Sequence, residues 1–165
     1  CGLAFDEGGT LYVGDRSGSI FKVTASGQVD LFASLPPSVA AFHLEMAPTG
    51  ELYVTAPTLS TRDALYRIDE TGDVTMVVRR FGRPQGLAFD PQGRLHIVEA
   101  LAGASGVYQL RSDGEAAYVV AGTALVGVAF DRAGGAVVVS NDTAYRFSHI
   151  PDGFGASRDF GAMAP

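Results

Sequence analysis

The stretch GRPQGLAFDPQGRLHIVEA, residues 82–100, determines the fold expected for this chain. Two short runs of strand-forming residues, 86–89 and 95–98, flank the turn DPQG at 90–93. Proline presets φ early in such a turn, and glycine supplies a residue that tolerates left-handed backbone. The stretch therefore predicts a β-hairpin.

The same pattern occurs four times along the chain. It appears as CGLAFDEGGTLYVGD at 1–15, FHLEMAPTGELYVTA at 42–56 and VGVAFDRAGGAVVVS at 126–140. Equivalent positions 2, 43, 86 and 127 are separated by 41, 43 and 41 residues. A period near 40 residues, carried by strands and turns, is typical of β-propeller blades.

Each repeat also contains further strand candidates. They are 19–23 and 29–33 in the first repeat, 64–68 and 74–78 in the second, 106–110 and 116–120 in the third, and 144–148 in the fourth. We therefore expect an all-β fold with four-stranded blades at about 1–35, 42–78, 85–120 and 126–150. These form one domain over 1–150. Residues 151–165 are expected to be a C-terminal tail or an incomplete last strand, with 158–160 as its remaining strand-like segment.

The number of blades leaves two architectures open. Propellers have about four to eight blades, so the chain is either an arc of a larger ring or a closed four-bladed ring. The arc is favoured because the sequence starts, without an initiator methionine, at the first innermost strand. An open arc exposes the flanks of its terminal blades, so we expect self-association. The cellular compartment cannot be predicted from such a start.

Composition excludes some partners. The net charge of −6 disfavours nucleic acid, which requires a basic face. No stretch approaches the roughly 18 apolar residues of a membrane span. A single cysteine, Cys1, provides no internal disulfide. The expected partners are a small molecule and further propeller blades.

The repeat GLAFDxxGxLYV resembles the gluconolactonase and regucalcin-like superfamily, to which NHL-repeat propellers are close relatives. The resemblance implies a six-bladed ring of about 250 residues, of which about two blades would be missing. It also implies a divalent cation, Ca²⁺ or Zn²⁺, at the ring centre. In that family, Asn and Asp just before the innermost strands help to bind the cation.

The positions that match these ligands are occupied differently here. They hold Cys1, Phe42, Gln85 and Val126. Neither Phe42 nor Val126 can supply the oxygen donors that Ca²⁺ requires. The sequence therefore predicts a degenerate metal site whose ligands are unknown.

His43 and Glu45 are the candidate catalytic residues. The other three repeats carry Gly and Ala at these two slots. Residues two apart on a strand share a face, so the pair could act as a base or binding group near the channel mouth. Alternatively, the two side chains fill a gap between blades and hydrogen-bond to the backbone.

By the same resemblance, one face of the ring binds ligands, formed by the loops between second and third strands and between blades. The candidate ligand-binding residues on these loops are Asp15, Arg62, Asp63, Arg79, Arg80, Arg83, Gln85 and Asn141. Guanidinium groups bind carboxylates in bidentate fashion, which indicates a small polar or anionic ligand such as a sugar acid. Ordinary solvated loops are the alternative. Asp15 and Glu99, at equivalent strand ends, are expected to tie loops together.

Two functions are consistent with these observations. The first is a hydrolase of the lactonase type, acting on a sugar lactone or related cyclic ester. The second is a non-catalytic NHL-like propeller that binds a small molecule, polysaccharide or protein on its loop face. The sequence does not decide whether the protein is an enzyme.

Overall fold

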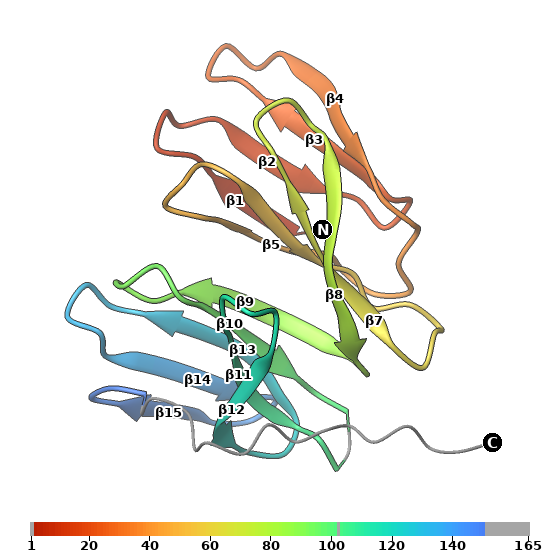
Figure 1. Cartoon of the computed structure of the whole chain (residues 1–165). Coiled ribbons are helices and arrows are strands. Elements are labelled where there is room, and N and C mark those ends of the chain that lie inside the picture. The colour runs from red at the N-terminus through yellow and green to blue at the C-terminus, as the bar shows by residue number, and fades with distance from the viewer. Residues whose placement is uncertain (1, 102, 151–165) are drawn as a thin grey trace.

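The computed structural model describes residues 2–101 and 103–150, and these form fifteen β-strands in four antiparallel sheets (Figure 1). Blade 1 contains β1 (Gly2–Phe5), β2 (Leu11–Gly14), β3 (Ser19–Val23) and β4 (Val29–Ser34). Blade 2 contains β5 (His43–Met46), β6 (Leu52–Thr55), β7 (Asp63–Ile68) and β8 (Val74–Phe81). Blade 3 contains β9 (Pro84–Phe89), β10 (Leu95–Glu99), β11 (Gly106–Leu110) and β12 (Ala116–Ala121). Blade 4 contains β13 (Leu125–Phe130), β14 (Ala136–Ser140) and β15 (Ala144–Phe147).

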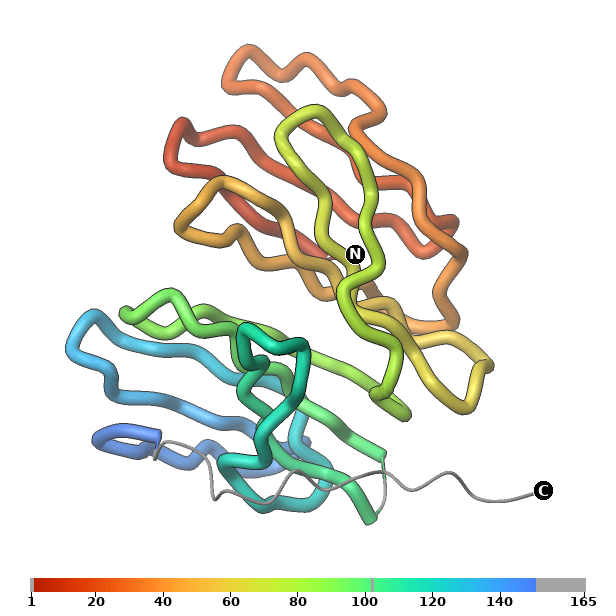
Figure 2. Tube along the Cα trace, in the orientation of Figure 1, coloured from red at the N-terminus to blue at the C-terminus, as the bar shows by residue number. Residues whose placement is uncertain are grey.

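The strands of each blade pair in sequence order, and the chain then passes to the next blade (Figure 2). The all-β propeller fold expected from the repeats is confirmed. The expected segment 158–160 of the last strand lies outside the described residues. No helix in the described part of the chain is long and apolar enough to cross a membrane.

In blades 1, 3 and 4 the first hairpin closes through a short turn that begins with aspartate, whereas the corresponding turn of blade 2 begins with Ala47. In the 90–93 turn, the Asp90 carboxylate accepts hydrogen bonds from the backbone N–H groups of Gln92 and Arg94, at 3.0 and 2.9 Å. Gly93 has a φ of 75°, which L side chains rarely adopt. The carboxylates of Asp6 and Asp131 accept from turn N–H groups in the same way. These aspartates are therefore structural.

The innermost strands β1, β5, β9 and β13 lie beside one another in that order. They approach closely. A Cβ built on Gly2 would collide with the Phe42 carbonyl oxygen, and one built on Gly86 would lie 3.0 Å from the Gly127 Cα. This convergence explains why small residues recur at the start of the innermost strands.

Apolar packing is divided among the three junctions between blades. One cluster joins blades 1 and 2 through residues such as Ile20 and Phe42. A second joins blades 2 and 3 through Phe81 and Tyr108, whose rings meet edge to face with centroids 6.1 Å apart. A third joins blades 3 and 4. Each blade thus depends on its neighbours to bury its faces.

The four blades form an open arc. Leu3 and Phe5 on β1 are 59% and 63% exposed, although both are large and apolar. The strand register places them on one face of blade 1 with six further apolar residues. This surface, the N-terminal flank, comprises Leu3, Phe5, Leu11, Val13, Phe21, Val23, Val29 and Leu31. The alternative of a closed four-bladed ring is therefore wrong.

One expected loop is largely strand. The sequence placed residues 79–85 in a link between blades, but β8 continues to Phe81 and β9 starts at Pro84. Phe81 is fully buried and pairs with Asp63, which extends the β7–β8 ladder past Arg79 and Arg80. The placement of Arg79, Arg80 and Gln85 in a loop was therefore wrong. Tertiary packing outweighs the local pattern here.

Candidate functional site

His43 and Glu45 lie on β5 and face blade 3 at the inner end of the junction between blades 2 and 3. The imidazole of His43 hydrogen-bonds to the side chain of Gln85 on β9. The carboxyl of Glu45 accepts a hydrogen bond from the backbone N–H of Phe89, also on β9. Both side chains are half-buried. The pair thus replaces the small residues found at the equivalent slots with ionisable groups that bridge two blades.

Burial sets the protonation state of each group. Burial lowers the pKa of His43 below its ordinary value of 6.5, and the hydrogen bond with Gln85 opposes this change. Burial raises the pKa of the Glu45 carboxyl from 4.5 to about 7, against a partial lowering by the Phe89 N–H. At neutral pH the imidazole is therefore uncharged. The carboxyl is poised between its acid and base forms, which suits a group that transfers protons.

Thr55 positions this pair from the adjacent strand. It pairs with His43 in the β5–β6 ladder, and its buried hydroxyl donates a 2.7 Å hydrogen bond to the carbonyl oxygen of Gln85. The hydroxyl thus fixes the backbone of the residue whose side chain contacts His43. The sequence analysis missed Thr55. The only signal was a hydroxyl residue at the end of the apolar run LYV.

A hollow of about 170 Å³ opens beside His43 at the start of the innermost strands. It is lined by Gly2, Leu3, Ala41, Phe42, His43, Leu44, Gly86 and Leu87. Cavities that enclose drug-sized ligands measure roughly 300–1,000 Å³. The hollow is smaller than such cavities, and His43 is the one ionisable residue among those that line it.

Glu99 ties together the loop between β8 and β9 and the loop that follows β10. Its carboxylate, 1% exposed, accepts hydrogen bonds from the backbone N–H groups of Gly82, Arg83 and Leu101 at 2.6, 2.8 and 2.7 Å. Burial raises its pKa and these N–H groups lower it. The expected loop-tying role is confirmed for Glu99.

The other predicted ligand residues differ in burial and in their hydrogen-bond and ion-pair partners. Arg80 forms a 2.8 Å ion pair with Glu115. The buried Asp63 accepts 3.0 and 2.6 Å hydrogen bonds from the backbone N–H and hydroxyl of Thr58, and its Oδ2 has no partner in the described structure. The carboxylate of Asp15 accepts a 2.9 Å hydrogen bond from the Ser17 N–H. Arg62, Arg79, Arg83 and Asn141 have exposed side chains.

One of these residues, Gln85, contacts His43 directly. Arg83 belongs to the loop that Glu99 ties, since its backbone N–H donates to the Glu99 carboxylate. The remaining residues stay predictions as ligand contacts.

The donor set does not fit the cation implied by the family resemblance. Within the described residues, no three His, Cys, Asp or Glu side chains come together to hold a metal ion. The matching positions are Phe42, just before β5, Gln85 on β9 and Val126 on β13, and Gln85 is engaged with His43.

Comparison with solved structures reveals the same fold in proteins of several activities. A gluconolactonase from Xanthomonas campestris superposes with a TM-score of 0.69 and 20% identity, over 90% of this chain and 59% of its own. A PQQ-bound aldose sugar dehydrogenase from Streptomyces coelicolor gives 0.68 and 19%, over 84% and 55%. Virginiamycin B lyase from Staphylococcus aureus gives 0.61 and 17%, over 88% and 54%. The sequence matches no protein-family profile and no curated protein.

These likenesses establish the propeller fold. At 17–20% identity they carry no activity over to this chain. The chain spans less than two thirds of the length of each of these proteins.

Proposed function

We propose that this chain is part of a gluconolactonase-like propeller that hydrolyses a sugar lactone or related cyclic ester, with Glu45 as its general base. The observation that supports this is a half-buried carboxyl with a pKa of about 7 on an innermost strand, where the other repeats carry alanine. A base is most effective when its pKa lies near the working pH.

The proposed reaction uses water as the nucleophile. The Glu45 carboxylate takes a proton from water as the water oxygen bonds to the lactone carbonyl carbon. The ring C–O bond then breaks, and the proton passes from Glu45 to the departing alkoxide. The product is an open hydroxy acid. Neutral His43, held by Gln85, binds a polar group of the substrate at the hollow.

Hydrolysis of δ-gluconolactone by the full chain, corrected for the spontaneous reaction, tests this proposal. Glu45→Gln should lower kcat by about 10²-fold or more, since general-base catalysis contributes about 10²–10⁴-fold. Glu70→Gln, which alters an exposed glutamate in the β7–β8 turn, is the matched control and should leave kcat unchanged. Equal kcat in wild type and Glu45→Gln would exclude Glu45 as the base.

The second candidate is a non-catalytic recognition module. Arg83, beside the junction, has an exposed side chain with no hydrogen bond or ion pair to other described residues. A guanidinium in this state is available for a carboxylate. A wild-type chain that fails to hydrolyse the lactone but binds gluconate, with loss of binding in Arg83→Gln, would favour this second function.

A further inference from the structure

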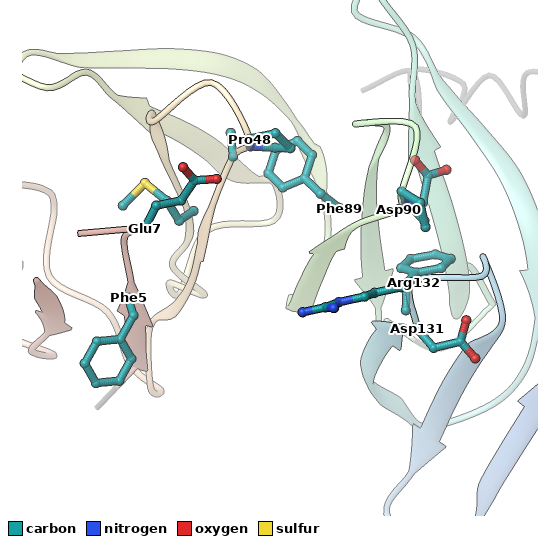
Figure 3. Close-up of a pocket in the computed structure, with 11 residues that line it drawn as sticks. Phe5, Glu7, Pro48, Phe89, Asp90, Asp131 and Arg132 are labelled. Carbon is teal, nitrogen blue, oxygen red and sulfur yellow. The ribbon is translucent and has the colours of Figure 1, made fainter. Parts of the chain in front are cut away.

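The opposite ends of the innermost strands meet around a second cavity, of about 420 Å³, which Figure 3 shows. All four blades contribute to it through the ends of β1, β5, β9 and β13 and the turns that follow. Its size lies within the range of ligand pockets. It is separate from the hollow beside His43, with which it shares no lining residue.

The base of this cavity is apolar. Phe89 and Phe130 line it from the ends of β9 and β13, together with Met46 from β5. Both rings are held in place from behind. Tyr53 meets Phe89 edge to face at a centroid distance of 5.3 Å, and His96 packs on Phe130 at 4.7 Å. The two rings therefore form a fixed apolar surface for a ligand.

Most polar groups in the lining serve the turns. The Asp90 carboxylate binds two turn N–H groups and the Arg94 guanidinium, the latter at 2.6 Å. The Asp131 carboxylate binds the N–H groups of Ala133 and Gly135 at 2.9 and 2.8 Å. These two carboxylates are therefore occupied by hydrogen bonds within their own turns.

Glu7 and Arg132 differ from these aspartates. They occupy the same turn position in blades 1 and 4, where blades 2 and 3 carry Pro48 and Pro91. Neither side chain makes a hydrogen bond or an ion pair with another described residue. In Figure 3, Arg132 extends from the β13–β14 turn toward the side on which Glu7 and Phe5 lie. The turn itself requires neither charge, because prolines take the same place in two blades.

We propose that this cavity binds a short zwitterionic peptide with apolar side chains. Arg132 would pair with its carboxylate, Glu7 with its ammonium group, and Phe89 and Phe130 would contact its apolar body. Guanidinium–carboxylate pairs are among the stronger hydrogen-bonded contacts in proteins. A nearby apolar surface reduces the screening of both charges by water. The two charges come from the first and last described blades, so a ligand bearing both termini would span the mouth.

Calorimetric titration of the full chain with the dipeptide phenylalanyl-leucine at low ionic strength tests the proposal. We expect saturable one-to-one binding. Arg132→Gln and Glu7→Gln should each weaken it by about tenfold or more, because each removes the charge that would bind one terminus of the dipeptide. Arg111→Gln, at an exposed arginine in the β11–β12 turn, is the matched control and should leave affinity unchanged.

Blocked dipeptides assign each charge to its terminus. The dipeptide with an amidated C-terminus should bind wild type as weakly as the free dipeptide binds Arg132→Gln. The amidated dipeptide should bind Arg132→Gln no more weakly than it binds wild type. The N-acetyl derivative should behave in the same way toward Glu7→Gln. No saturable binding, or equal affinities in wild type and both variants, would overturn the proposal. All four proteins should show the same strand content by circular dichroism, which separates loss of the site from loss of the fold.

Discussion

Replacing Glu45 by glutamine should make the folded protein more stable at alkaline pH. In the unfolded chain this carboxyl titrates near 4.5, whereas in the folded protein burial raises its pKa to about 7. Between these values the folded state binds more protons than the unfolded state. The free energy of unfolding therefore falls as pH rises from about 4.5 to about 7, and the loss is complete above about 7.

The interval between 4.5 and about 7 corresponds, at about 1.36 kcal/mol for each pKa unit, to about 3 kcal/mol. The side chain is only half-buried, so solvent screening reduces this to about 2 kcal/mol. Glutamine retains an acceptor for the Phe89 N–H but carries no charge. The advantage of Glu45→Gln over wild type should thus be small at pH 4 and about 2 kcal/mol at pH 8.

Urea unfolding at pH 4, 5, 6, 7 and 8 measures this difference. Glu70→Gln serves as the control, because that side chain is exposed and should track wild type throughout. The comparison between variants matters because histidines also titrate in this range. If wild type and Glu45→Gln gave parallel profiles from pH 4 to 8, the carboxyl would not be desolvated and the argument for a general base would fail with it.

Three further predictions concern other parts of the structure. Glu99→Ala leaves three part-buried backbone N–H groups without their acceptor, and thermal or urea unfolding should show a loss in the free energy of unfolding of about 3 kcal/mol. Burial lowers the pKa of His96 below 6.5, so the imidazole is protonated more readily in the unfolded chain than in the folded protein. The free energy of unfolding of wild type should therefore fall as pH falls below about 6.5. His96→Gln should remove this part of the pH dependence from the urea profiles. Leu31→Lys on the N-terminal flank should shift the chain toward a monomer in light scattering, whereas Leu59→Lys, at a 91% exposed loop leucine, should not; equal masses for both variants would argue against association through this flank.

The blades could be predicted because their signals are local. The turn at 90–93 needs only its own aspartate and glycine, and the period near 40 residues repeats the same hairpin four times. The end of β8 could not be predicted. Arg79 and Arg80 resemble a solvated link in the sequence, whereas in the structure Phe81 after them is buried against Tyr108 of the next blade and pairs with Asp63.

The candidate site was predicted in part. His43 and Glu45 stood out because they break a repeated pattern of small residues. Their contacts with Gln85 and Phe89 depend on how blade 3 is staggered against blade 2, which no single repeat encodes. Glu7 and Arg132 were missed for a related reason. In the sequence, a charged residue in a turn resembles any solvated surface residue. Only the fold shows that the turns of all four blades line one cavity.

The apolar core is divided into three clusters, one for each junction between blades. This division affects how the protein unfolds. Units that contact only their neighbours behave as a linear array of coupled elements, so unfolding need not be all-or-none. Blades 1 and 4 each have one partner among the described blades, whereas blades 2 and 3 have two. Fraying should therefore proceed inward, with amide hydrogen exchange fastest in the outer blades. Glu45 and its partner Phe89 belong to the inner pair, in the part of the array that should open last.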